Sequence, residues 1–275
     1  MKSLLTGAAV IGLAAFAGGF PLFAQLQDNT EKHLSCENGG YDSDRARHCE
    51  MREQSLPAVG KLGVDAGKNG GASVKGWLRG DVLVRTRVEA SADTQAAAES
   101  LASRVLIDGS GGQVRAMGPE STDNSGWNVS YEIFVPQSTD LTVTTYNGGI
   151  QISDVRGQIH FDVHNGGVQL KRVAGEVTGA TVNGGIQVEL AGAAWEGRQM
   201  DVSTTNGGVQ VTLPAVYSAH VQAETHSGRI QSDFPVAVQG NVRPRQLDFN
   251  IGAGGPLIHV ATENGGISLK RAETR

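Results

Sequence analysis

The chain has 275 residues and a formal net charge of −5, with 38 glycines and only 5% aromatic residues. This mild acidity provides no electrostatic basis for binding nucleic acid or an anionic membrane surface. Abundant glycine is typical of tight turns, because glycine adopts backbone conformations that other residues avoid. The composition therefore favours a turn-rich protein and argues against a basic nucleic-acid-binding domain.

Residues 1–24 predict a secretory signal peptide. Lys2 supplies a positive charge, the stretch Leu4–Phe16 is almost entirely apolar, and small residues lead to a cleavage site after Ala24. A membrane anchor is the less favoured interpretation, because a span needs roughly 20 apolar residues. We expect an exported protein, periplasmic or at the cell surface, with no integral membrane segment after cleavage.

Residues 25–57 are polar and read as an irregular lead-in to the fold. They contain the chain's two cysteines, Cys36 and Cys49. An even pair in an exported chain predicts one disulfide. A metal site would need further ligands close by, and His48 alone is too little. No cofactor is expected.

Residues 58–138 predict an N-terminal α+β cap. Alternation of apolar and polar residues indicates strands, most clearly over Trp127–Pro136. Between these strands, apolar residues from Ala96 to Val105 recur at helical spacing, and Asp93 is placed to cap that helix. One helix among strands predicts a cap over the open end of a repeat structure.

Residues 139–271 repeat a short phrase in which Asn-Gly-Gly separates two alternating runs. Repetition at a period near twenty residues predicts a solenoid, each repeat forming one coil. Asn and Gly tolerate positive φ, so we expect these residues to form the sharp corner between two strands. A weaker copy, THSGRIQS, lies at Thr225–Ser232. The corner residues are Asn147, Gly148, Gly149, Asn165, Gly166, Gly167, Asn183, Gly184, Gly185, Asn206, Gly207, Gly208, Asn264, Gly265 and Gly266.

Aligning the copies on their asparagine produces apolar columns with a period of two residues. Such columns stack on themselves from coil to coil and predict a parallel sheet. The fold class is therefore all-β: a parallel single-stranded β-helix with the α+β cap at its N-terminal end. The spacing from Ser227 to Asn264 leaves room for one enlarged coil between them. The column six residues before the asparagine comprises Leu141, Ile159, Val177, Met200, Val221 and Ile258.

The asparagines themselves predict a ladder. Coils stack at about 4.8 Å, so each amide lies within hydrogen-bonding reach of the same amide one coil away.

A column of glutamines follows the corners and faces outward. One interpretation is that the amides bond to one another and solvate a flat face. The other is a binding surface for sugar hydroxyls or for a polymer laid along the axis, since amides both donate and accept hydrogen bonds. The column comprises Gln151, Gln169, Gln187, Gln210 and Gln231, with Ser268 at its end.

Other outward residues include carboxylates and histidines that could serve in catalysis or metal binding. Parallel β-helices that cleave polysaccharides need paired acids, and Asp201 and Glu224 are the only outward pair on neighbouring coils, with no Arg or Lys in their column. His160 and His164 lie four residues apart, which on a strand separates them by about 13 Å, too far for one ion. No catalytic or metal site is predicted.

The NGG[IV]Q phrases at Asn147, Asn165, Asn183 and Asn206 and the final TENGG resemble those of a bacterial family of adhesin-like, exported β-solenoid proteins related to the head GIN domain. The segment HCEMRE after Cys36 resembles the start of many such proteins. The resemblance covers roughly residues 58–271 and implies a right-handed β-helix at the cell envelope. It implies no catalytic residue.

These observations predict a non-enzymatic adhesin-like or scaffold module that presents polar ladders to an envelope glycan or protein. The alternative is a carbohydrate-active β-helix enzyme, a polysaccharide lyase or hydrolase. A partner in envelope-stress sensing is a third possibility.

Overall fold

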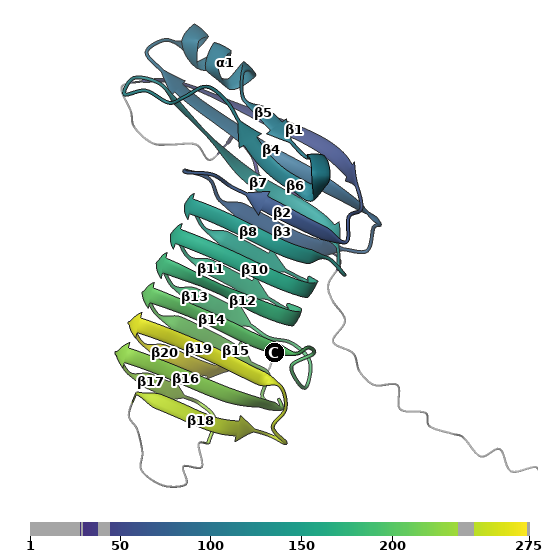
Figure 1. Ribbon diagram of the computed structural model, residues 1–275, viewed down its shortest axis with the longest axis vertical. Helices are drawn as coiled ribbons and strands as arrows, with labels where there is room; N and C mark the ends of the chain where they lie inside the picture. The colour runs from purple at the N-terminus through teal and green to yellow at the C-terminus, as the bar shows by residue number, and fades with distance from the viewer. Residues whose placement is uncertain (1–27, 29, 38–44, 236–244, 274–275) are drawn as a thin grey trace, which may run out of the picture.

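The computed structural model describes residues 28, 30–37, 45–235 and 245–273, which form a stack of coils beneath a cap (Figure 1). The predicted signal peptide lies outside these residues. Two sheets of ten strands face each other, and each coil contributes one strand to each sheet. The first sheet runs β1 (Ala46–Pro57), β4 (Asp81–Ala92), β7 (Gly126–Pro136), β3 (Ala72–Trp77), β9 (Ile150–Ser153), β11 (Val168–Lys171), β13 (Ile186–Glu189), β15 (Val209–Leu213), β20 (Ile267–Arg271) and β17 (Ile230–Ser232). The second runs β18 (Gln246–Ile251), β16 (Ala219–Ser227), β19 (Leu257–Asn264), β14 (Gln199–Asn206), β12 (Ala174–Asn183), β10 (Arg156–Asn165), β8 (Asp140–Asn147), β2 (Lys61–Asp65), β6 (Gln113–Met117) and β5 (Leu106–Asp108).

The parallel stacking predicted from the columns is confirmed. Neighbouring coils pair in parallel, with Ile159 beside Leu141 and Val177, and Asn165 beside Asn147 and Asn183. Because the register places each repeat position over its counterpart, the alternating apolar residues share one interior between the two sheets. The column Leu141, Ile159, Val177, Met200, Val221 and Ile258 is buried throughout.

The Asn-Gly-Gly corners differ from the sequence-based expectation. None of their glycines has positive φ, so conformational freedom is not what these corners require. The middle glycine is instead required by the neighbouring coil: a Cβ on Gly166 would lie 2.0 Å from the carbonyl oxygen of Gly148, and one on Gly184 would lie 1.9 Å from that of Gly166. Glycine is thus selected for close approach of backbones.

Positive φ occurs at the opposite corner of two coils. Asp154 (φ 57°) follows β9, and Arg172 (φ 49°) follows β11. Both are non-glycine residues in the left-handed region of backbone conformation, which residues other than glycine rarely adopt. Their side chains pair with each other across the two coils.

The cap contains the predicted helix, with a shifted start. Helix α1 (Gln95–Ser103) is capped by Thr94, whose hydroxyl accepts a hydrogen bond from the Ala97 amide, and not by Asp93. The helix packs on β1 and β4, and a short 3₁₀ turn (Ser110–Gly112) precedes β6.

Near the cap, two segments of the chain have a different structure from the one that the sequence predicts. Residues 46–57, expected to be irregular, form the long strand β1, because every one of them pairs antiparallel with β4. The segment β2–β3, placed with the cap by sequence, forms the first coil: β2 pairs with β8 and β3 with β9, and Asn69 stands next to Asn147. The cap strands are inserted between this coil and the next.

The order of the last coils also differs. We expected the Thr225–Ser232 copy to follow Asn206, yet β19 and β20 lie between β14–β15 and β16–β17. The intact final copy continues the ladder from Asn206 through Asn264, whereas the weaker copy has Ser227 at that position. The chain reaches this arrangement through β18, which pairs antiparallel with β16. The degenerate repeat therefore lies near the end of the stack, where no further ladder has to be supported.

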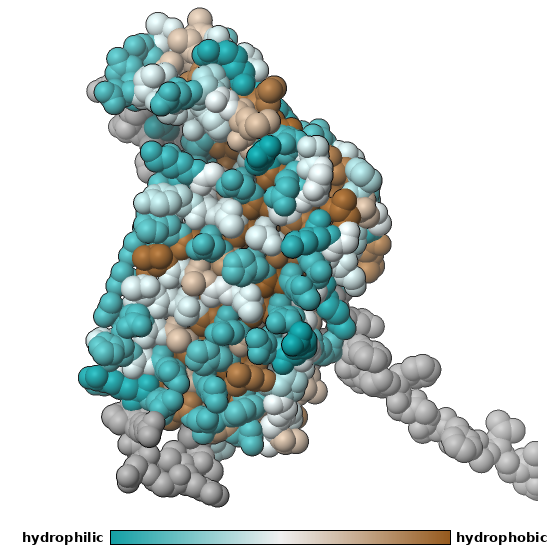
Figure 2. All heavy atoms as spheres, in the orientation of Figure 1, coloured by the Kyte–Doolittle hydropathy of each residue, from teal (hydrophilic) through white to brown (hydrophobic). Residues whose placement is uncertain are grey.

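On the face seen in Figure 2, hydrophilic residues cover much of the surface, and apolar residues are visible between them. No helix in the described ranges is both long enough and apolar enough to cross a membrane.

Candidate functional site: the glutamine column

The corners hold the outward side chains in a fixed repeat through two internal ladders. The predicted asparagine ladder is confirmed: each amide nitrogen donates to the amide oxygen of the preceding asparagine in the stack, at 2.7–3.0 Å. The ladder runs through Asn69, Asn147, Asn165, Asn183, Asn206 and Asn264.

A second ladder lies on the inner side of the same corners. Buried threonine hydroxyls donate to the carbonyl of the middle glycine one coil away, as Thr204 does to Gly184 at 2.7 Å. These bonds satisfy backbone carbonyls at the turn. Val163 occupies the equivalent position of its coil and carries no hydroxyl. The donating residues are Thr145, Thr181, Thr204, Thr225 and Thr262.

The glutamines form the expected outward column on the first sheet. Gln169 pairs in register with Gln151 and Gln187, and Gln187 with Gln210. Ser268 lies between Gln210 and Gln231 and does not end the column, because its coil is inserted there.

The glutamine amides differ from the asparagine amides in one decisive respect. Within the described part of the chain, no hydrogen bond joins any of the column's five glutamine side chains to another protein group. The interpretation in which the glutamines satisfy one another is therefore not what the structure contains. Their donors and acceptors face solvent.

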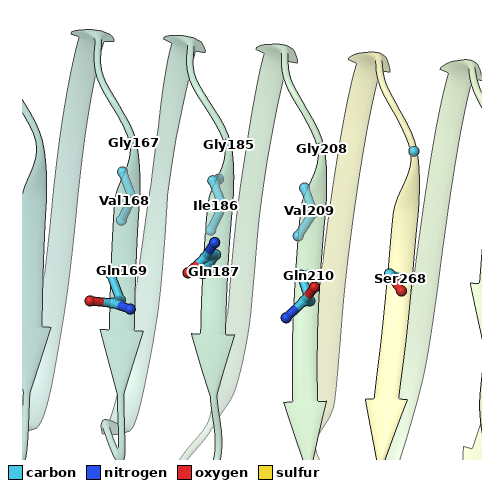
Figure 3. A pocket seen from close by; sticks show the side chains of 11 residues that line it. Gly167, Val168, Gln169, Gly185, Ile186, Gln187, Gly208, Val209, Gln210 and Ser268 are labelled. Carbon is cyan, nitrogen blue, oxygen red and sulfur yellow. The ribbon is translucent and has the colours of Figure 1, made fainter.

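A shallow groove of about 580 Å³ runs along this column. Its floor is formed by the last corner glycines, which leave room because they lack side chains, and its wall by Gln169, Gln187 and Gln210. In Figure 3 these side chains lie side by side on successive strands, with Ser268 in line. The glycines are Gly167, Gly185, Gly208 and Gly266.

The column continues into the cap, where its residues are charged. Ser73 pairs with Gln151 and with Glu132, which in turn pairs with Arg85. Glu132 is buried and accepts hydrogen bonds from Lys75 Nζ at 2.7 Å and from Arg85 Nη1 at 2.5 Å.

The N-terminal strap (residues 28 and 30–37) covers this charged part of the column. Glu132 accepts hydrogen bonds from the backbone amides of His33 at 2.8 Å and Leu34 at 3.2 Å. Burial raises the pKa of the Glu132 carboxyl, but the hydrogen bonds from Lys75 and from these two amides outweigh it, so its pKa lies below the usual range.

Further backbone contacts fix the strap. Lys75 also donates to the carbonyl of Glu31, and Arg85 to that of Leu34. The predicted disulfide is confirmed: Cys36 is bonded to Cys49 of β1. Sequence reasoning missed the role of Glu132, because its partners in the strap lie 98 and 99 residues away and share no pattern with it.

The carboxylates considered for catalysis are not brought together. The inserted strand β19 separates β14, which carries Asp201, from β16, which carries Glu224. With their offset of two residues along the strands, this places the two Cα atoms about 12 Å apart. Asp201 bonds to His259 at 2.7 Å, and Glu224 to Gln246 at 2.6 Å.

The outward histidines are each engaged separately. His160 bonds to Thr178 across neighbouring strands, and the ring of His164 stacks on Tyr146 with centroids 4.3 Å apart. In the ranges that the structure describes, no three His, Cys, Asp or Glu side chains gather in a metal-binding arrangement.

Comparisons with known proteins agree with this architecture. The sequence model of the family described as Toastrack DUF4097 matches residues 120–270, more than half of the chain. No curated protein matches the chain.

Three solved structures resemble the chain weakly. A "putative cell adhesion protein" from Clostridium sporogenes is 11% identical, with 82% of this chain and 100% of that one covered and a TM-score of 0.44. A "putative adhesin" from Bacteroides fragilis is 11% identical, with 82% and 97% covered and a TM-score of 0.32. A "putative lipid binding protein" from Parabacteroides distasonis is 10% identical, with 82% and 97% covered and a TM-score of 0.30.

Proposed function

Since the chain belongs to the Toastrack DUF4097 family, we propose that it is a non-enzymatic, adhesin-like binding module whose glutamine column binds a linear polar partner at the cell envelope. The observation that supports this proposal is the contrast between two amide columns on the same coils. The asparagine amides bond to one another, whereas the glutamine amides have no hydrogen-bond partner among the residues that the structure describes, and those of Gln169, Gln187 and Gln210 line a groove.

The geometry favours a linear partner over a compact one. Successive glutamines recur at the coil spacing of about 4.8 Å, so the column from Gln151 to Gln231 extends over about 24 Å. Each amide offers both a donor and an acceptor. A partner with polar groups along its length would pair with several of them at once, whereas a small molecule would meet only one or two.

The disulfide between Cys36 and Cys49 supports an extracytoplasmic location, because disulfides persist in oxidising compartments. We propose the periplasm or the cell surface, consistent with the signal peptide expected at residues 1–24.

The test uses a variant in which Gln169, Gln187 and Gln210 are all replaced by Met, which preserves side-chain length but removes the amide. The wild type and this variant are assayed against immobilised envelope polysaccharides and against a peptide array. We expect at least one probe to bind the wild type and to lose at least tenfold in affinity with the variant.

The matched control replaces Gln158 and Gln199, which lie on the outer face of the second sheet, by Met. This variant should bind like the wild type. If no probe binds, or if the two variants bind equally, the proposed function is wrong.

A further inference from the structure

The N-terminal strap shows how this sheet face binds a chain. The strap residues contact the outward side chains of successive strands, from Lys75 on β3 to Glu132 on β7 and Arg85 on β4. The strap therefore crosses the strands and runs in the direction in which the coils stack, rather than adding to a sheet edge.

The strap is held through its backbone as well as through side chains, which contribute the Lys32–Glu53 ion pair, the hydrogen bond from the Leu78 amide to Asp28 and the disulfide of Cys36. The Glu132 carboxylate accepts two of its amide N–H groups, while Lys75, Arg85 and Arg87 donate to the carbonyls of three of its residues. On the sheet, the acceptor Glu132 is thus flanked by the donor Lys75 on one side and the donors Arg85 and Arg87 on the other. Both kinds of group on a polypeptide backbone, which carries one donor and one acceptor per residue, are bound.

The glutamine column is the direct continuation of this binding row. Glu132 pairs with Ser73, Ser73 with Gln151, and Gln151 with Gln169. Below Gln151 the charged side chains give way to neutral amides. A glutamine amide both accepts from N–H and donates to C=O, so one residue type supplies what Glu132 and Arg85 supply to the strap.

We propose that the partner of the glutamine column is an extended polypeptide segment, bound across the strands through its backbone in the manner of the strap. This inference rests on the proposed function and narrows it from a linear polar partner to a peptide. A sugar polymer offers hydroxyls but lacks the regular alternation of N–H and C=O for which the strap provides the precedent.

The strap also sets one boundary of the site. A pocket of about 530 Å³ lies where the strap meets the column, and Gln151, Ser153 and Lys171 line it together with strap residues Glu31 and His33. Because the strap occupies the row beyond this point, a bound segment ends there. The free column of about 24 Å corresponds to roughly seven residues of extended chain at about 3.4 Å each.

The experiment measures binding of synthetic peptides of four to twelve residues to the full chain. Affinity should rise with length up to about seven residues and then level off. For the best-binding peptide, methylation of alternate backbone nitrogens should weaken binding at least tenfold, because it removes donors without changing the side chains. The triple Gln169, Gln187 and Gln210 to Met variant should lose binding to a similar degree, and the Gln158 and Gln199 control should not.

The outcomes separate the two proposals. Binding of polysaccharides but of no peptide, lost in the triple variant, would overturn the peptide inference and leave the proposed function standing. Peptide binding that is insensitive to backbone methylation would also overturn the inference. Absence of any binding that depends on the glutamine column would overturn both.

Discussion

Arg172 donates two hydrogen bonds to the carboxylate of Asp154, from Nε and Nη2 at 2.7 Å each, and both residues hold positive φ. The pair joins two successive coils at the corner opposite the Asn-Gly-Gly turns. Asp154 is fully buried, and the hydrogen bonds to it raise the pKa of the Arg172 guanidinium. Ion pairing and backbone strain thus coincide at one corner.

This coincidence predicts an unusual order of stability at position 172. Arg172→Ala leaves the Asp154 charge without this partner and should lower the free energy of unfolding by about 3 kcal/mol. Arg172→Gly loses the same pair but relieves the left-handed conformation, so it should be more stable than Arg172→Ala by about 1 kcal/mol. Urea denaturation of the three proteins measures both differences. Equal stability of the alanine and glycine variants would contradict the strain at this corner.

The Asn-Gly-Gly corners predict a sharp contrast between neighbouring glycines. Gly166→Ala would place a Cβ 2.0 Å from the Gly148 carbonyl oxygen and force the coils apart, so it should cost more than 2 kcal/mol. Gly167→Ala places its Cβ 3.5 Å from the nearest atom and should change stability by less than 1 kcal/mol. Thermal melting of both variants provides the comparison. Similar melting temperatures for the two would argue against close coil approach as the reason for glycine here.

The asparagine ladder predicts that position within the stack determines the cost of a substitution. Asn165→Ala breaks bonds to both Asn147 and Asn183, at a cost of about 1–2 kcal/mol. Asn264→Ala breaks only the bond to Asn206 and should cost about half as much. Chemical denaturation measures both. The reverse order would show that the ladder bonds contribute little.

Glu132 predicts a dependence of stability on pH. The pKa of Glu132 in the folded protein lies below its ordinary value of 4.5, so ionised Glu132 contributes stability above about pH 4.5. That contribution is lost as the pH falls through the lower folded-state value. The measurement is the difference in melting temperature between the wild type and Glu132→Gln from pH 7 to pH 3.

The Glu132→Gln variant should be less stable near neutral pH by about 3 kcal/mol, because the buried Lys75 loses its charged partner. The difference between the two proteins should shrink below pH 4.5. Hydrogen exchange at His33 and Leu34 locates the effect in the strap. A difference that stays constant over this range would rule out Glu132 as its source.

Much of the solenoid was predictable because its evidence is local and repeated. The Asn147 and Asn165 phrases define the coil, and period-two columns define which residues point inward. The inserted last coil was not predictable, because Asn264 and Ser227 fit the same repeat and only packing decides which of them continues from Asn206. The glutamine column was predicted as an outward surface, but only the tertiary structure showed that, among the described residues, its side chains do not bond to one another.

Sequence alone determined the parallel coil, its inward faces, the asparagine ladder and the disulfide. The first three depend on contacts between equivalent positions of successive repeats, and the disulfide joins the only two cysteines. Tertiary structure decided the order of the coils, the reason for the corner glycines and the docking of the strap on Glu132. Those features depend on contacts between backbones or between residues far apart in the chain. Such contacts leave no periodic pattern in the local sequence.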